Sequence, residues 1–201
     1  MGTEYDDDFY STIADGCDRS ARIIAKMVSK KYKPKTVLDI GCGEGYWARA
    51  FSDLGADTCG VDGDYVTDPV CPSFMACDIS KPFSPFGTYD LVVNLEVAEH
   101  LPAARAAGFV ADMCAHTNRV LFSAAIPYQT GTGHINCQWP SYWVDLFAAQ
   151  GFGVDDSLRW EIWNDERIEP WYRQNIMVFE RGREITSVND AVHPVIHYWG
   201  R

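Results

Sequence analysis

The stretch VLDIGCGEG, residues 37–45, decides how this chain folds. Its first four residues are apolar and β-prone apart from Asp39, which is the pattern of a short buried strand. Gly41, Gly43 and Gly45 then alternate with larger residues and predict a tight turn, in which the missing Cβ atoms let the backbone approach a ligand closely. Residues 46–54 continue as an amphipathic helix. Together they predict the first half of a βαβ unit.

The spacing of these glycines indicates the kind of ligand. The pattern is G-x-G-x-G, not the G-x-G-x-x-G that places a pyrophosphate on a helix N-terminus, and Asp39 suits an ammonium group better than a phosphate. On these residues the chain resembles class I S-adenosylmethionine (SAM) methyltransferases, whose ligand has an amino acid end and no phosphate. The resemblance extends roughly over residues 36–180 and is closest to small bacterial methyltransferase-domain proteins. It implies a Rossmann-like α/β fold: a seven-stranded, mostly parallel sheet with helices on both faces and an antiparallel last strand.

Size and composition are those of one globular domain. The chain has 201 residues, of which 47% are hydrophobic and 22% charged, enough for a substantial core. We expect one SAM-dependent methyltransferase domain over residues 1–201, with a helical segment at 1–33, a core at 34–181 and a tail at 182–201.

Charge and cysteine content limit the partners. The net charge of −11 repels nucleic acid and anionic membranes. No apolar run approaches the roughly 20 residues of a membrane span, and the acidic N-terminus is no secretory signal. The seven cysteines are odd in number and never spaced C-x-x-C, which favours free thiols in a reducing cytosol. We expect a cytoplasmic protein that acts on a small molecule; the oligomeric state is not predicted.

Acidic residues at the ends of the next strands suit the cofactor. The strand expected at 57–61 ends at Asp62, which can accept hydrogen bonds from both ribose hydroxyls. The resemblance implies that Asp78, after the strand at 74–77, takes the adenine amino group, that Ile79 packs on the ring, and that Leu95, at the end of the strand at 89–95, borders SAM. The predicted cofactor residues are therefore Asp39, Gly41, Gly43, Gly45, Asp62, Asp78, Ile79 and Leu95.

The segment 127–143, PYQTGTGHINCQWPSYW, follows a strand expected at 119–126. A loop this long in a compact domain is usually functional, and Ser141 is expected to cap a helix through residue 149. In related methyltransferases an aromatic N-terminal segment such as this one, with Tyr5, Phe9 and Tyr10, folds over the cofactor as a lid; packing of the helix on the sheet is the alternative. The predicted acceptor-binding residues are Tyr10, Tyr128, Asn136, Trp139 and Trp143.

Two strands, at 152–158 and 175–180, are expected to close the sheet as an antiparallel pair. Between them, residues 160–173 carry three tryptophans among charges and either roof an acceptor pocket or pack against the sheet edge.

Catalysis by such a domain needs help mainly at the acceptor. SAM supplies an activated methyl group, so the protein must align nucleophile, methyl and sulfur, and an oxygen acceptor must lose its proton. Histidine titrates near pH 7 without perturbation, which makes His134 and His100, with Glu99, the candidate catalytic residues.

The spacing Glu96-x-x-Glu99-His100 also resembles an E-x-x-E-H metal motif of two methyltransferase families, one acting on ubiquinone precursors and one on small-RNA ends. The alternative is therefore a magnesium or manganese ion held by Glu96, Glu99, His100 and His134. We favour the interpretation without a metal.

Other uses of SAM fit the same signature, because the glycine turn contacts only the cofactor. A lyase, a cyclising enzyme, 3-amino-3-carboxypropyl transfer and a non-catalytic SAM-binding partner stay open. A nicotinamide dehydrogenase is disfavoured by the glycine spacing and by Asp39. We expect a methyltransferase that acts on a small-molecule acceptor, at an oxygen, in a secondary-metabolite or glycan pathway.

Overall fold

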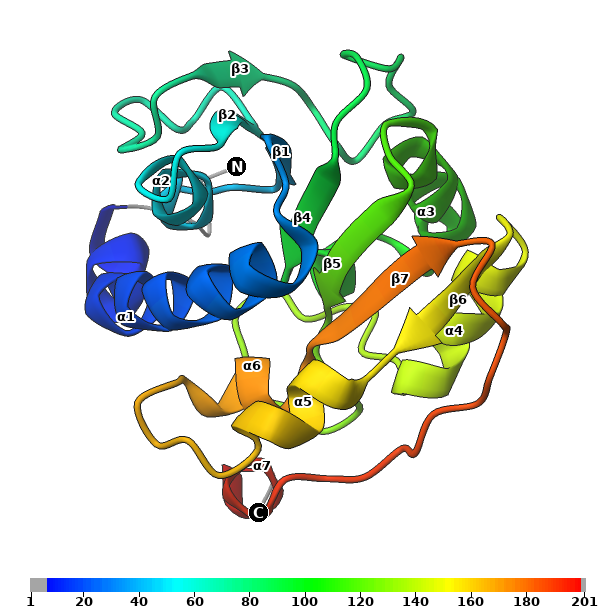
Figure 1. Ribbon diagram of the computed structural model, residues 1–201. Coiled ribbons are helices and arrows are strands. Elements are labelled where there is room, and N and C mark those ends of the chain that lie inside the picture. The colour runs from blue at the N-terminus through cyan, green and yellow to red at the C-terminus, as the bar shows by residue number, and fades with distance from the viewer. Residues whose placement is uncertain (1–6, 200–201) are drawn as a thin grey trace.

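The computed structural model describes the backbone of residues 7–199 and the side chains of residues 14–197. Its strands are β1 (Thr36–Ile40), β2 (Asp57–Asp62), β3 (Phe74–Ala76), β4 (Leu91–Leu95), β5 (Arg119–Ser123), β6 (Phe152–Asp155) and β7 (Met177–Arg181). Within the described residues they form one seven-stranded sheet in the order β3-β2-β1-β4-β5-β7-β6 (Figure 1). Neighbouring strands are parallel, except that β7 runs antiparallel to β5 and β6. The predicted fold class is confirmed.

Helices cover both faces of the sheet, as Figure 1 shows. One face carries α1 (Asp7–Tyr32), α2 (Tyr46–Ser52), α5 (Ser157–Ile162) and α6 (Pro170–Asn175); the other carries α3 (Ala106–Ala115) and α4 (Pro140–Ala148). Two short 3₁₀ turns, η1 (Ala98–His100) and η2 (Ala103–Arg105), follow β4, and α7 (Pro194–Trp199) ends the described chain.

Each central strand contributes to a hydrophobic core on both faces. Val37 packs with the α1 side, whereas Leu38 and Ile40 pack with the α3 side. All five residues of β4 are buried, which explains why its sequence is a continuous apolar run rather than an alternating one. The carboxyl ends of β1, β2, β4 and β5 therefore meet at one edge, where α/β proteins bind ligands.

Several predicted boundaries differ from the observed ones: the strand predicted at 119–126 ends at Ser123, that at 89–95 begins at Leu91, and that at 175–180 begins at Met177. Two further differences have clear local reasons. The strand predicted at 152–158 ends at Asp155, because the Asp155 carboxylate accepts a hydrogen bond from the Ser157 N–H (3.1 Å) and starts α5 there. The helix predicted to begin with Ser141 as its cap begins at Pro140, with Trp139 as the N-cap. Ser141 instead donates its N–H (3.0 Å) and its hydroxyl (2.6 Å) to the Asp190 carboxylate.

The first helix begins at Asp7, within the helical segment expected at 1–33. The side chains of Tyr5, Phe9 and Tyr10, on which the lid hypothesis depends, lie outside the described residues. Among the described helices, none is both long and apolar enough to cross a bilayer.

Candidate active site

A cavity of about 1180 Å³ lies at the carboxyl edge of the sheet. Pockets for a single ligand are typically about 300–1,000 Å³, so this cavity has room for a cofactor and an acceptor. Its wall comes from the glycine turn, the segments after β2, β3 and β4, the loop after β5, and two helices. The described lining lies within residues 41–47, 62–65, 76–80, 95–101 and 129–135, with Cys17, Trp171 and Tyr172.

The glycine turn adopts backbone conformations that other residues rarely reach. Gly41, Gly43 and Gly45 have φ values of 77°, 52° and 88°. A Cβ atom added to Gly41 would lie 2.6 Å from the Val97 side chain, and one added to Gly45 would lie 2.8 Å from Cys71. Gly41 and Gly43 line the cavity, whereas Gly45 caps α2 behind it. The glycines therefore let the turn pack closely against its own neighbours as well as against a ligand.

Two aspartates support this turn from different sides. Asp39 is 2% exposed and lies off the described cavity wall, where its carboxylate accepts the Ala48 N–H (3.1 Å) and burial raises its pKa to about 8. Asp62 lines the cavity and accepts the N–H groups of Gly43 and Gly63, both at 2.7 Å, and the Tyr65 hydroxyl. Asp39 thus anchors α2 beneath the turn, while Asp62 is within reach of a ligand.

The remaining predicted cofactor residues also lie on the wall. Ile79 and Leu95 present apolar surface to the cavity, and Asp78 pairs with Lys81 (2.7 Å) beside it. Among the described lining residues there are carboxylates but no Lys or Arg. Such a wall fits SAM, which has two cationic centres and no phosphate, better than it fits a dinucleotide.

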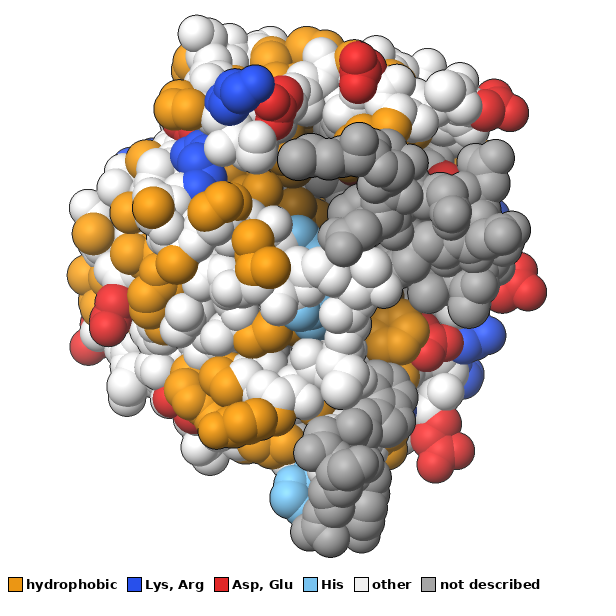
Figure 2. All heavy atoms as spheres, turned by 180° about the vertical axis from the view of Figure 1, so that it is seen from behind, with side chains coloured by type: hydrophobic (Ala, Val, Ile, Leu, Met, Phe, Trp, Pro, Cys, Tyr) orange, Lys and Arg blue, Asp and Glu red, His pale blue; other side chains and the backbone are white. Residues whose placement is uncertain are grey.

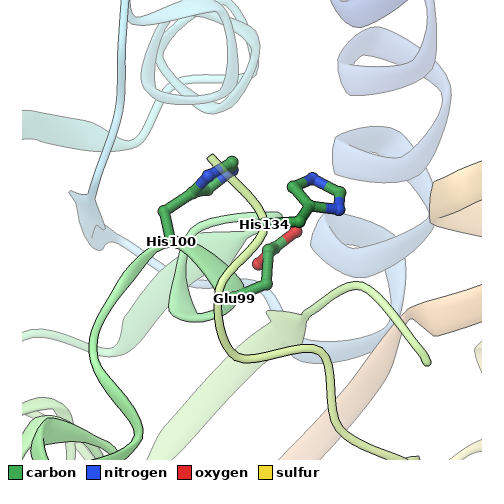
Figure 3. Close-up of side chains that lie close together, drawn as sticks. All are labelled: Glu99, His100 and His134. Carbon is green, nitrogen blue, oxygen red and sulfur yellow. The ribbon is translucent and has the colours of Figure 1, made fainter. Parts of the chain in front are cut away.

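Two histidines, His100 and His134, lie close together on the cavity wall (Figure 3). The rings of His100 and His134 are 4.9 Å apart, edge to face. His100 Nδ1 lies 3.2 Å from the Gly133 carbonyl oxygen, and His134 Nδ1 lies 3.0 Å from that of Gln129. A carbonyl only accepts, so in each neutral ring Nδ1 donates and Nε2 has the lone pair. Burial lowers the pKa of His100 to about 4 and also lowers the pKa of His134, so both rings are neutral near pH 7.

Glu99 lies next to these rings but behind the wall. Its side chain is fully buried, and one ligand atom each from Glu99, His100 and His134 lie within 4.8 Å of one another. Among the described residues, neither Glu99 oxygen has a well-formed hydrogen bond. Burial, together with the neighbouring charge of Glu96, raises the pKa of Glu99 well above its usual range.

Glu96 is held differently. Gln129 Nε2 donates to its carboxylate at 2.9 Å, and Asn175 Nδ2 donates at 3.0 and 3.2 Å. Burial raises the pKa of Glu96 to about 7, against the effect of these donors. The structure therefore brings three of the four alternative metal ligands together, while amide groups occupy the carboxylate of the fourth. Sequence analysis missed Gln129, although it lies in the singled-out loop, and Asn175, which no motif marks.

The structure brings none of the predicted acceptor residues with a described side chain to the described cavity wall. Tyr128 is 84% exposed, and Asn136 is buried with its Oδ1 accepting from Gln138. Trp139 caps α4, and Trp143 is 1% exposed and packs on Phe122 in the core. The side chain of Tyr10 lies outside the described residues.

Other residues of the same segments line the cavity instead: Gln129, Thr130, Thr132 and Ile135 from the loop, and Trp171 and Tyr172 from α6. Of the tryptophans in 160–173, only Trp171 lies on the described wall; Trp160 and Trp163 stack on each other, 4.8 Å apart, away from it.

Comparison with known proteins identifies the class. The family model described as a methyltransferase domain matches residues 14–125, more than half of the chain, and the chain belongs to this family. It has the fold of class I SAM-dependent methyltransferases, whose cofactor is SAM.

The curated relatives are also described as methyltransferases, and their descriptions name no substrate. An uncharacterized methyltransferase of Mycobacterium tuberculosis is 32% identical over 106 residues, which is 47% of this chain and 41% of that protein. An uncharacterized methyltransferase of Mycobacteroides abscessus is 34% identical over 80 residues, 34% of this chain and 30% of that one. The matched region thus spans well under half of these relatives.

Solved structures agree in fold. The SAM-bound amino pentose methyltransferase of Micromonospora echinaspora superposes with a TM-score of 0.67 at 14% identity, over 88% of this chain and 98% of that one. Magnesium protoporphyrin IX methyltransferase of Synechocystis PCC 6803 with bound S-adenosylhomocysteine (SAH) gives 0.63 at 18% identity, over 85% and 86%. At such identities the likeness concerns the fold alone.

Proposed function

We propose that this chain transfers the methyl group of SAM to a hydroxyl group of a small-molecule acceptor. The observation that carries the proposal is the pair of neutral histidines, His100 and His134, anchored through Nδ1 on the wall of a cavity that has room for cofactor and acceptor. Bound SAM supplies a sulfonium methyl as the electrophile. The acceptor oxygen forms a bond to this methyl as the carbon–sulfur bond breaks, and the hydroxyl proton passes to an imidazole Nε2, leaving SAH.

The residues of the chain have separate tasks in this scheme. Gly41, Gly43 and Asp62 bind the cofactor, supported from behind by Asp39 and Gly45. The buried loop carbonyls of Gln129 and Gly133 fix the histidine tautomer, which keeps each lone pair on Nε2. The lowered pKa values leave both rings unprotonated near pH 7, which is the form in which Nε2 can accept a proton.

The class of acceptor and the place of action belong to the same proposal: a small molecule of a secondary-metabolite or glycan pathway, in the cytoplasm. The net charge of −11 supports it, since such a field disfavours nucleic acid and anionic membranes. All seven cysteines are free thiols, which supports a reducing compartment.

Titration with SAM followed by mass spectrometry of the products tests the proposal. We expect SAM to bind and to stay intact until an acceptor is added, and then to yield SAH and a methylated product. Methylthioadenosine would instead support a lyase, a cyclising enzyme or aminocarboxypropyl transfer. Binding of SAM without turnover of any acceptor in a broad hydroxylated panel would support a non-catalytic partner.

A second version of the site contains a divalent cation. The buried Glu99 carboxyl without a well-formed hydrogen bond, beside two Nε2 lone pairs, favours it, since one carboxylate and two imidazoles suit a divalent metal. Glu99, His100 and His134 would hold the ion, which would acidify an acceptor hydroxyl. Melting curves with EDTA and with added Mg²⁺, Mn²⁺ or Zn²⁺ test this: stabilisation that disappears in Glu99→Gln would support a metal, and unchanged melting would support the metal-free base.

A further inference from the structure

The charge of the cavity wall has one sign. Five carboxylates lie on the described wall, and no Lys or Arg does: the acids are Glu44, Asp62, Asp64, Asp78 and Glu96. Residues 1–13 add Glu4 and Asp6–Asp8 to the sequence and no basic residue. In Figure 2 the pale-blue histidine surface near the centre of the visible face is surrounded by orange and white, and the blue of Lys and Arg lies further out. A phosphate or carboxylate on an acceptor would therefore meet repulsion here and find no countercharge.

Glu96 differs from Asp78 and Asp62 in the groups that hold its carboxylate. Asp78 pairs with the Lys81 ammonium, and Asp62 is fixed by backbone N–H groups of its own turn. The Glu96 carboxylate accepts hydrogen bonds from the uncharged amides of Gln129 and Asn175, and no Lys or Arg of the described residues pairs with it. A buried carboxylate without a neighbouring cation is costly, and a ligand that supplies the cation recovers this cost.

The backbone at Glu96 supports a functional role. Its φ of 56° is unusual for a residue with a side chain. The conformation is held by the Glu96 N–H, which donates to the Ser123 carbonyl (3.0 Å) and lies 3.1 Å from the Ser123 hydroxyl. Strained residues of this kind gather at sites that must aim a side chain, and here the side chain lies on the cavity wall beside the histidines.

We infer that Glu96 binds a protonated nitrogen of the acceptor, so the acceptor is a small molecule that carries an ammonium group near the methylated hydroxyl and carries no phosphate or carboxylate. Gln129 and Asn175 are positioning residues, because their amides donate to the Glu96 carboxylate and fix its orientation. The inference rests on the proposed function, which supplies the hydroxyl and the methyl transfer.

The experiment uses matched sets of small polyols and sugars that differ in one group, for example glucosamine, glucose and glucuronic acid, together with amino alcohols and aminocyclitols. Calorimetry measures their binding to the SAH-loaded protein, and mass spectrometry measures methylation by SAM. We expect the ammonium-bearing members to bind and their neutral and anionic counterparts to bind at least about tenfold more weakly. Equal binding within the sets, or no binding by any ammonium-bearing member, overturns the inference.

Glu96→Gln keeps the shape of the side chain and removes its charge. We expect it to weaken binding of the ammonium-bearing probes by about 10- to 100-fold and to leave SAH affinity unchanged. Glu161→Gln, which removes one charge from an exposed position off the described wall, is the matched control and should change neither. Loss of SAH affinity in Glu96→Gln with unchanged discrimination would mean that Glu96 serves the cofactor, and would overturn the inference.

A second variant, designed to gain binding of anionic probes, tests the inference if Glu96→Gln does not fold. Thr130 is exposed on the cavity wall next to Gln129, so Thr130→Lys adds a cation without disturbing the buried amides. We expect Thr130→Lys to weaken binding of the ammonium-bearing probes and to allow binding of the anionic ones. Unchanged selectivity would contradict the inference. Failure of the proposed function looks different, because the protein would then fail to bind SAM or would never produce SAH with any bound probe.

Discussion

Two parts of the cavity wall differ in how far apart in sequence their hydrogen-bonded residues lie. The cofactor wall contains the glycine turn and Asp62, and the acceptor wall contains Glu96, His100 and His134; both are named for the ligands that we propose for them. Behind the cofactor wall, the Asp39 carboxylate accepts a backbone N–H 9 residues away, and on that wall Asp62 accepts one 19 residues away. On the acceptor wall, Glu96 is held by Gln129 and Asn175, which are 33 and 79 residues away. The bonds that hold the glycine turn and Asp62 are therefore formed within one βαβ unit, whereas the bonds that hold Glu96 exist only after β4, the loop after β5 and α6 have packed together.

This difference predicts separable effects of mutation. Changes in the glycine turn should affect SAM binding first, and changes around the histidines and Glu96 should affect transfer while SAM binding persists. The following experiments test that separation, from the largest expected effect to the smallest.

Replacement of Gly41 should have the largest effect. In Gly41→Ala the new Cβ would approach Val97 to 2.6 Å on a backbone with φ of 77°, so we expect SAM affinity to fall by about 100-fold or more. Gly55→Ala is the control, since Gly55 has φ of 91° but nothing within 4 Å of an added Cβ. Both should lose about 1 kcal/mol of stability from backbone strain, but only Gly41→Ala should lose SAM in calorimetry. Equal SAM affinity in the two variants would place the cofactor elsewhere.

Removal of a histidine should leave the cofactor wall intact. We expect His134→Ala to lower kcat by about 10²- to 10⁴-fold, the usual contribution of a general base, with SAM affinity unchanged. His100→Ala should show whether the second ring shares the task. Normal turnover by His134→Ala in single-turnover assays would remove His134 from the mechanism.

The buried carboxyl pair should give stability a dependence on pH. The pKa of Glu96 is raised to about 7 and that of Glu99 is raised well above its usual range, so the folded protein binds more protons than the unfolded chain above pH 4.5. Their contribution is thus fully present below about pH 4.5 and is lost as pH rises through 7 and beyond.

Glu99→Gln should reduce the loss of stability as the pH rises. We expect the variant to be more stable than the wild type at pH 8, relative to pH 5, by about 1–3 kcal/mol in urea unfolding. The lowered pKa values of His100 and His134 act in the opposite direction in both proteins. A parallel pH dependence of the two would mean that Glu99 is ionised.

Tyr128 should give the smallest effect. It is 84% exposed and has φ of 71°, so Tyr128→Gly should gain a few tenths of a kcal/mol from relieved backbone strain. We expect kcat/KM within about twofold of the wild type. A large loss of kcat/KM would restore Tyr128 as the acceptor contact that the sequence suggested.

The sequence alone determined the features that depend on neighbouring residues. A buried strand, a turn that needs positive φ and an amphipathic helix are local requirements, so residues 37–54 were sufficient to predict the first half of a βαβ unit. The seven-stranded sheet followed from the resemblance to class I SAM methyltransferases that these residues carry. The same logic located Asp62, Asp78, Ile79 and Leu95 at strand ends, where the cavity lies. The loop 127–143 was singled out by length and composition, and residues 129–135 of it line the cavity. Its aromatic residues were assigned to the acceptor, but Trp143 belongs to the core.

Only the tertiary structure decided which way those loop residues face and what holds the buried acids. Trp143 points into the core because α4 begins at Pro140. Gln129 points inward because its amide forms hydrogen bonds with Glu96 and Asn175. A buried charge must be satisfied by whichever polar groups packing brings near it, and those groups need not be close in the sequence. For that reason the glycine turn and Asp62 could be predicted from a motif, while the surroundings of Glu96, which we propose to bind the acceptor, required the folded chain.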